Sequence, residues 1–214
     1  MSAHGRGRSN ADPIALSYNE SRLRMSDVQL LQGPYWLNNH ILSFYFEYLK
    51  HDRYKNNPDL LFVSPVVTQC MKLMDDSELE TLLNQLKAPH KPFIFFALNG
   101  NDGDHRSLLV FSRPEKTFFH FDSCGTINSN VSHQFVQHVK DALDCHHSSM
   151  KPVRCLQQTN GYDCGIHVIC MTDNIADYVN RFEIIDGVGP LHQDTISAKR
   201  SELVKLIRSL SRKN

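Results

Sequence analysis

The pattern of apolar residues predicts a helix after the first aromatic cluster of the chain. Asn38 and Asn39 precede a run that ends at Leu49, and either asparagine can cap a first helical turn through its side-chain oxygen. The apolar and aromatic residues of the run then fall on one helical face. These residues are Ile41, Phe44, Tyr45 and Tyr48.

Leucines at helical spacing predict a second helix. Ser77 and Glu80 stand three residues apart, the spacing of a capping box, and the pattern stops before Pro89. The same period predicts three further helices. They cover Val131–Leu143, Cys164–Val179 and Thr195–Leu210.

Dense runs of phenylalanine, leucine and valine predict strands over Phe93–Leu98, Ser107–Ser112 and Thr117–Asp122, with a short strand at Val153–Leu156. The turn sequence Arg113-Pro114-Glu115-Lys116 joins the second of these to the third, so we expect an antiparallel hairpin. Helices before and after a central run of strands indicate an α+β fold.

Composition favours one compact domain. The chain has 214 residues, 41% of them hydrophobic, which is enough to bury a sizeable core. We expect residues 11–214 to form a single domain and residues 1–10, rich in glycine, serine and arginine, to form a disordered tail.

Charge and cysteine content argue against several classes of function. Lysine and arginine number 23, as do aspartate and glutamate, so no overall charge attracts nucleic acid. No run approaches the roughly 20 apolar residues of a membrane span. Six sparse cysteines without an export segment predict the cytoplasm or nucleus. The 12 histidines and six cysteines lack zinc-finger spacing, so we expect no metal.

Cys164 stands at the start of a predicted helix, where a thiol can become a nucleophile. Asp163 is a candidate cap, which leaves Cys164 in the first turn, where unpaired N–H groups and the positive end of the helix dipole favour a thiolate. The alternative is a small buried apolar residue like Cys170. Position alone leaves both interpretations open.

The predicted hairpin brings His105 and Asp122 to the same end of two strands. A turn centred between Pro114 and Glu115 offsets each from the other's direct partner by two positions, a diagonal of about 7 to 8 Å between α-carbons. Asp122 can then orient the His105 ring, which accepts a thiol proton. Taken singly, each has a plainer explanation, as a histidine or an aspartate at a strand end.

Gln158, six residues before Cys164, is a candidate oxyanion group, because its amide and the Cys164 backbone N–H can both donate to a developing negative charge. The alternative is an exposed loop glutamine.

These residues and their neighbours resemble the Ulp/sentrin-specific cysteine protease family. The resemblance rests on His105 with Ser107-Leu108-Leu109-Val110, on Phe119-His120-Phe121-Asp122-Ser123, on Gln158, on Gly161-Tyr162-Asp163-Cys164-Gly165-Ile166-His167-Val168, and on Trp36-Leu37-Asn38. It extends from about Leu16 to the last predicted helix. The short chain and the opening Leu16-Ser17-Tyr18 most resemble the deneddylase branch.

The resemblance implies a papain-like α+β fold of the adenain/Ulp type, with a central, mostly antiparallel sheet flanked by helices. It implies that Cys164 attacks the carbonyl after the terminal Gly-Gly of a ubiquitin-like modifier, forming a thioester that water releases without any cofactor. The expected modifier is of the Nedd type, with SUMO or ubiquitin as alternatives. Expected partners include conjugates such as cullins, and we expect a monomer.

Two positions depart from the family pattern at the narrow channel for the modifier tail. Trp36 matches one wall of that channel, whereas Arg106 stands where the family has a second tryptophan. Asn39 replaces a common aspartate that meets a basic residue of the modifier, so one charge-assisted contact is lost. The alternatives to an active isopeptidase are therefore a catalytically weakened modifier-binding protein and a related thiol enzyme that transfers acyl groups.

Overall fold

A five-stranded sheet forms the centre of the computed structural model, which describes residues 11–100, 103 and 105–213. The strands follow the order β3 (Leu60–Val63), β4 (Phe93–Asn99), β5 (Arg106–Ser112), β6 (Thr117–Phe121) and β7 (Ser149–Val153). Pairs β4–β5 and β5–β6 are antiparallel, whereas β3–β4 and β6–β7 are parallel. The α+β class is confirmed, but the sheet is mixed rather than mostly antiparallel. Helical segments connect β3 to β4 and β6 to β7, and such crossovers make each of these pairs parallel.

The central strands agree with the sequence prediction, and the outer strand β7 does not. Ser112 pairs with Thr117 across the predicted hairpin. The strand predicted at Val153–Leu156 instead covers Ser149–Val153. It is an edge strand that contains Pro152 and few buried side chains, so its apolar pattern is weak.

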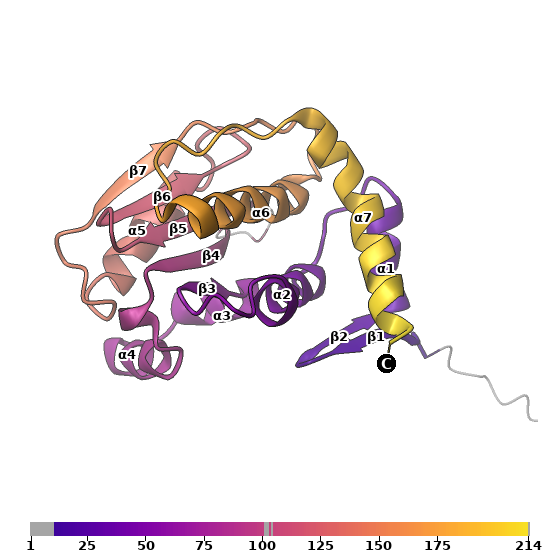
Figure 1. Cartoon of the computed structure of the whole chain (residues 1–214), viewed down its shortest axis with the longest axis horizontal. Coiled ribbons are helices and arrows are strands. Elements are labelled where there is room, and N and C mark those ends of the chain that lie inside the picture. Colours follow the sequence, from indigo (N-terminus) through magenta and orange to yellow (C-terminus); the bar gives the residue numbers. More distant parts are fainter. Residues whose placement is uncertain (1–10, 101–102, 104, 214) are drawn as a thin grey trace, which may run out of the picture.

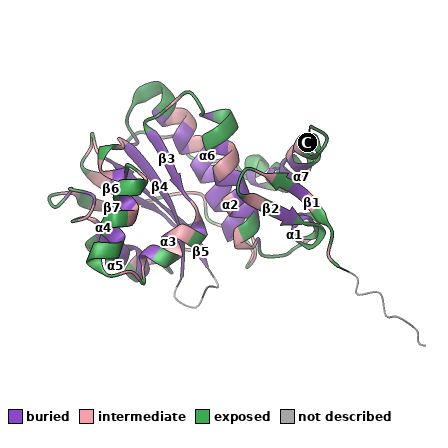
Figure 2. Cartoon of the chain, turned by 90° about the horizontal axis from the view of Figure 1, so that it is seen from below, coloured by how far each residue is buried: buried purple, intermediate pink, exposed green. Residues whose placement is uncertain are grey.

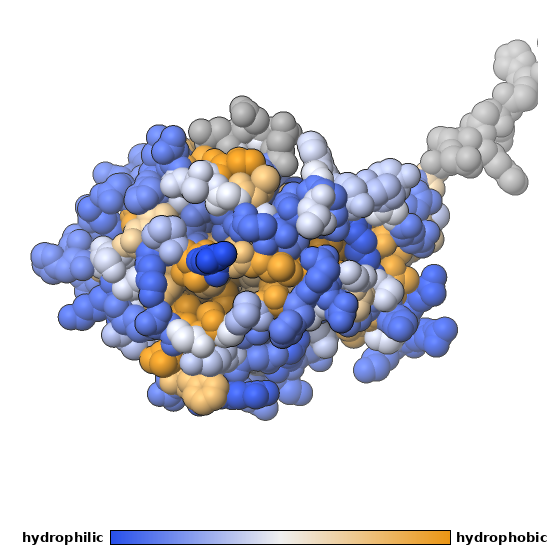
Figure 3. All heavy atoms as spheres, turned by 90° about the horizontal axis from the view of Figure 1, so that it is seen from above, coloured by the Kyte–Doolittle hydropathy of each residue, from blue (hydrophilic) through white to orange (hydrophobic). Residues whose placement is uncertain are grey.

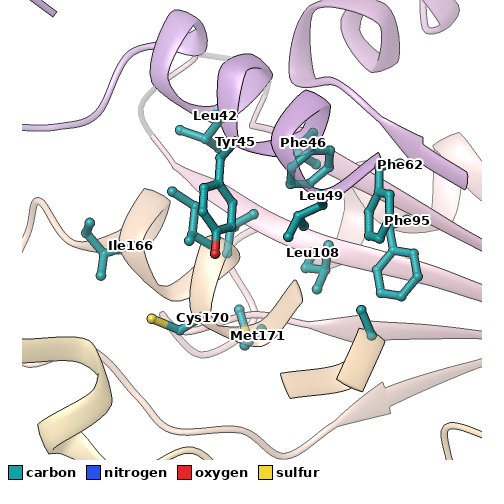
Figure 4. Close-up of a cluster of buried hydrophobic side chains, with 14 of the residues drawn as sticks. Leu42, Tyr45, Phe46, Leu49, Phe62, Phe95, Leu108, Ile166, Cys170 and Met171 are labelled. Atoms are coloured by element: carbon teal, nitrogen blue, oxygen red, sulfur yellow. The ribbon is translucent and has the colours of Figure 1, made fainter. Parts of the chain in front are cut away.

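One face of the sheet is covered by α2 (Asn39–Tyr48) and α6 (Cys164–Phe182). Figure 4 shows Leu42, Tyr45 and Phe46 of α2 facing the sheet, where Phe95 and Leu108 lie. The core therefore sets how α6, and with it Cys164, sits against the sheet.

The opposite face is covered by α3 (Pro65–Met71), α4 (Asp76–Gln85) and α5 (Ser129–Val139). Figure 1 shows α6 crossing one side of the sheet with α5 behind it, and Figure 2 shows the strands buried between the helical layers. Burial on both faces explains why β4 is apolar from Phe93 to Leu98. The helix α5 ends at Val139, earlier than the predicted Leu143, because the chain turns there.

The helix starts show which capping predictions were right. Asn38, one of the two candidates, caps α2 by accepting from the Ile41 N–H at 3.2 Å. The predicted box of Ser77 and Glu80 is wrong, since Asp75 and Glu78 form the box of α4 at 2.9 and 3.2 Å. Two boxes of the same spacing overlap in this sequence, and the one that begins with a carboxylate starts the helix two residues earlier.

A smaller layer joins the two ends of the described chain. The hairpin of β1 (Ile14–Tyr18) and β2 (Ser21–Arg24) leads into α1 (Met25–Gln29), and the last helix, α7 (Gln193–Ser211), packs against β1 (Figure 1). Short helical turns complete the described elements at Leu30–Gln32, Leu49–Arg53 and Ala88–His90. The tail predicted at residues 1–10 lies outside the described residues.

The surface is mostly hydrophilic, and the face in Figure 3 also exposes a group of apolar side chains near its centre. Within residues 11–100 and 105–213, no helix has the length and apolar character required to cross a membrane.

Candidate active site

His105 and Asp122 meet at one end of the sheet. His105 precedes β5 and Asp122 follows β6, and the register that pairs Leu108 with Phe121 places both at the same edge. The ring Nε2 of His105 lies 2.6 Å from Oδ1 of Asp122. This contact leaves Nδ1 as the nitrogen that is free to serve the thiol.

Asp122 is held by several donors besides the ring. Its carboxylate accepts from the backbone N–H groups of Cys124 and Asn128, each at 2.9 Å. Burial alone would raise the pKa of Asp122, but the hydrogen bonds from His105 and these two N–H groups outweigh burial and lower the pKa. The carboxylate therefore stays ionised and fixes the tautomer and orientation of His105.

Cys164 is the first residue of α6, as predicted, but Asp163 does not cap the helix with its side chain. The Asp163 carboxylate instead accepts from Asn160 at 2.8 Å and from Arg200 at 2.8 and 3.1 Å. The prediction of a side-chain cap is wrong because an arginine of α7 takes the carboxylate. Cys164 keeps the first-turn position, where the helix dipole favours a thiolate.

The Cys164 thiol and the His105 ring form a hydrogen-bonded pair. Burial alone would raise the pKa of Cys164, but the hydrogen bonds from the His105 ring and the Arg106 backbone N–H, with the charges of both residues, lower it. Burial would likewise lower the pKa of His105, yet its bonds to Asp122 and Cys164 raise it to about 9. The opposite shifts of the two pKa values favour a thiolate–imidazolium pair, the reactive form of a cysteine nucleophile.

Gln158 lies on the loop that leads to Cys164, and this loop is hydrogen-bonded to Ser123, the residue after Asp122. Its backbone N–H donates to the Ser123 carbonyl at 2.8 Å, and its Oε1 accepts from the Ser123 hydroxyl at 2.9 Å. Its Nε2 donates to the Asn160 carbonyl at 2.7 Å. An amide nitrogen carries two hydrogens, so a second one remains for an oxyanion.

Trp36 rests against the same loop from the other side. Its indole N–H donates to the backbone carbonyl of Gly161, and the side chain is 49% exposed. The adjacent Leu37 packs on the start of α6, where a Cβ added to Gly165 would lie 3.1 Å from the Leu37 side chain. The absence of a side chain at Gly165 lets the Trp36 segment approach the nucleophile closely.

Arg106 and Asn39, the two departures from the family pattern, contact each other. The Nη2 of Arg106 donates to Oδ1 of Asn39 at 3.1 Å. Arg106 is 8% exposed and Cys164 is 2% exposed, and the guanidinium interacts with the thiol. Position 106 therefore holds a buried cation that contacts both the thiol and the first residue of α2.

Two residues of the site were not found from the sequence. Asn128 holds the edge together, because its side chain donates to the His105 carbonyl at 3.5 Å and to the Ser107 hydroxyl at 3.1 Å. Its place in the loop after Asp122 gave no sequence signal of this role. Arg200 joins α7 to the loop before Cys164, and nothing in the sequence distinguishes it from other helix-surface arginines.

The described residues include no group of side chains suited to bind a metal ion. Among the residues that the structure describes, no three histidine, cysteine, aspartate or glutamate side chains are grouped so that they could hold a metal ion. The chemistry available here is that of a thiol, an imidazole, a carboxylate and amide donors.

Comparison with known proteins shows that the chain is similar to cysteine proteases of one family. Residues 35–207 match the model of the Ulp1 protease family, C-terminal catalytic domain. Sentrin-specific protease 8 of Mus musculus is 37% identical over 212 residues, covering 95% of this chain and 96% of the mouse protein. NEDD8-specific protease 1 of Arabidopsis thaliana is 28% identical over 220 residues, covering 95% and 96% respectively.

Among solved structures, the C-terminal Ulp1 protease domain in complex with Smt3, the yeast orthologue of SUMO, has a TM-score of 0.74 to this chain at 19% identity. The likeness covers 95% of this chain and 90% of that one, and it confirms the Ulp-type fold.

Proposed function

Because the chain belongs to the Ulp1 protease family, we propose that it is a thiol isopeptidase that cleaves after the C-terminal Gly-Gly of a ubiquitin-like modifier. The observation that supports this most strongly is the line of Cys164, His105 and Asp122 at one edge of the sheet. That line contains a nucleophile, a base and an orienting carboxylate in hydrogen-bonding contact.

The acylation step uses the thiolate–imidazolium pair. The Cys164 thiolate attacks the carbonyl of the last glycine, and the carbonyl electrons move onto oxygen. When the intermediate collapses, the imidazolium of His105 gives its proton to the departing lysine amine, and a thioester remains on Cys164. Asp122 keeps the ring in place through the 2.6 Å contact.

Two hydrogen-bond donors stabilise the oxyanion, one from each side of the turn before α6. One is the backbone N–H of Cys164, the first residue of α6, because the first N–H groups of a helix lack intrahelical partners. The other is the second amide hydrogen of Gln158. Neutral His105 then takes a proton from water, which attacks the thioester and releases the modifier.

Two observations support a Nedd-type modifier and its conjugates, such as cullins, as substrates. Relatives that match almost the whole chain are named for sentrin and for NEDD8. The Trp36 indole, half exposed over the Gly161 carbonyl, offers a flat wall for a tail that lacks side chains. We further propose that the enzyme acts in the cytoplasm or nucleus, as its sparse cysteines predict.

The test is a panel of electrophile-tipped modifiers. Purified protein is incubated with ubiquitin, SUMO and the Nedd-type modifier, each carrying a C-terminal electrophile, and covalent adducts are measured by mass spectrometry. We expect an adduct with the Nedd-type probe at Cys164. The exposed Cys70 on α3 supplies the matched control, because Cys70→Ser removes a thiol outside the site and should leave the adduct intact.

Substitution of the nucleophile separates catalysis from binding. Cys164→Ser should abolish turnover while the unmodified modifier still binds, measured by calorimetry. A wild-type protein that binds the modifier, yet forms no adduct with any probe, would instead support the modifier-binding alternative.

A further inference from the structure

Arg106 contacts the reacting sulfur from two directions. It is the first residue of β5, directly after His105, and its backbone N–H hydrogen-bonds to the Cys164 thiol. Its guanidinium interacts with the same thiol and is also anchored to Asn39 on α2 at 3.1 Å. The side chain therefore spans the gap between the sheet edge and α2 directly at the nucleophile.

This guanidinium is buried and has few partners. Arg106 is 8% exposed, and its Nε has no hydrogen-bond partner among the residues that the structure describes. Burial lowers the pKa of Arg106, and of the ionisable groups in the described ranges only Cys164 acts against burial to favour the charged form. A buried cation requires an anion nearby, and within the described residues Cys164 is the group placed to supply it.

The other described titratable groups around the sulfur are either paired or neutral. His105 faces the thiol from the sheet edge and is held by Asp122. Asp163, directly before Cys164, is paired with Arg200. His167, on the next turn of α6, has its pKa lowered by burial and so stays neutral. Of the groups that the structure describes here, Arg106 is thus the permanent positive charge at the nucleophile.

We propose that Arg106 is a catalytic residue whose guanidinium, anchored by Asn39, pairs with the Cys164 thiolate as a second cation beside the His105 imidazolium. This rests on the proposed function in that Cys164 is the nucleophile. The thiol proton still goes to His105, and Arg106 lowers the free energy of the anion that remains. A neutral tryptophan at this position would leave that work to the imidazolium alone.

The experiment measures the ionisation of Cys164 without any modifier. Full-length protein is alkylated with iodoacetamide over a range of pH, and the rate at the Cys164 peptide is followed by mass spectrometry. The midpoint of the pH profile reports the thiol pKa, and the plateau reports access to the sulfur. In Arg106→Gln we expect the midpoint to rise by about one unit, since a neighbouring opposite charge shifts a pKa by about 1 to 3 units.

Arg181→Gln is the matched control. Arg181 is exposed near the far end of α6. At 1.5 Å per residue it lies about 25 Å from Cys164 along the helix, well beyond the screening length of about 8 Å at physiological salt. Arg181→Gln removes the same charge far from the sulfur and should leave the midpoint unchanged.

Further variants keep the test decisive if Arg106→Gln does not fold, which circular dichroism would reveal. Arg106→Trp also removes the charge and should raise the midpoint similarly. Asn39→Ala keeps the charge but removes its anchor, so we expect a smaller rise. In a His105→Gln background, where the imidazolium is absent, Arg106→Gln should still raise the midpoint.

The outcomes are distinct. An unchanged midpoint in both Arg106 variants would overturn the proposal, as would a change in plateau alone, which would make Arg106 a steric cover. A shifted midpoint with no adduct from any modifier would refute the proposed substrates and leave the pairing with Arg106 intact. Adduct formation with an unshifted midpoint would support the proposed function and refute the pairing with Arg106.

Discussion

Arg200 on α7 ties together the two segments that flank the nucleophile, so its removal should affect both stability and catalysis. The guanidinium donates to the Asp163 carboxylate at 2.8 and 3.1 Å, and to the carbonyls of Leu30 and Tyr35, each at 2.7 Å. Tyr35 precedes Trp36, and Asp163 precedes Cys164. One side chain thus sets the spacing between the Trp36 segment and the sulfur.

The magnitude follows from the burial of this pair. Both side chains are 16% exposed, so solvent screens the interaction little. Breaking a buried pair by removing one partner costs about 3 to 5 kcal/mol, because an unpaired charge is left behind. For Arg200→Met we expect a loss of about 3 kcal/mol, at the lower end because the pair is not fully buried. At about 2 to 4 °C per kcal/mol for a chain of this size, the melting temperature should fall by about 6 to 12 °C.

The assays are thermal denaturation and hydrolysis of a modifier carrying a C-terminal fluorophore. A misplacement of about 1 Å can cost about 100-fold in rate, so kcat/KM should fall well below the level that the unfolded fraction explains. Arg208→Met, an exposed substitution on the same helix, is the matched control and should change neither quantity.

A double-mutant cycle with Asp163→Asn isolates the pair. We expect a coupling energy of about 1.5 to 3 kcal/mol between Arg200 and Asp163, the range for hydrogen bonds to charged groups. Coupling near zero, together with a melting temperature of Arg200→Met within about 1 °C of wild type, would refute the reasoning.

Three further predictions concern the sheet edge. Asp122→Asn should lower kcat by at least about 100-fold with the fold intact by circular dichroism, because His105 loses its orienting carboxylate; near-normal kcat would contradict this. The pH profile of kcat/KM should fall only as pH passes about 9, where His105 loses the proton that the leaving amine needs; a decline near pH 6.5 would show that the ring is unperturbed. Burial lowers the pKa of His120 to about 4, below its unfolded value of about 6.5, so the unfolded state binds the extra proton. The free energy of unfolding should therefore drop by up to about 3 kcal/mol between pH 6.5 and 4 in urea titrations, and His120→Gln should remove this slope.

The hairpin that carries His105 and Asp122 was predictable because its information is local. Four turn residues join two apolar strands, and the centre of the turn fixes the register from Ser112–Thr117 to Leu108–Phe121. The same is true of α6, whose apolar face is continuous from Cys164 onward. Where periodicity is strong, the sequence predicts which face of a helix or strand is buried. The positions of the residues at the ends of that helix or strand can then be predicted too.

Other elements were missed where the local signal was weak or ambiguous. The strand β7 lies at an exposed edge and shows little alternation. The helix α3 was not predicted, although Ser64 caps it and Pro65 begins it, because the helix is only seven residues long. In α4, two capping boxes of equal spacing overlapped, and spacing alone could not choose between them.

The sequence by itself determined the chemical types at the site, the helix that begins at Cys164 and the hairpin that pairs His105 with Asp122. The tertiary structure decided which distant side chains meet them. Arg106 reaches Asn39 across 67 residues of chain, and Arg200 reaches Leu30 across 170. The physical reason is that periodicity records whether a side chain is buried, whereas the partner of a buried charge depends on how helices from opposite ends of the chain pack on the sheet.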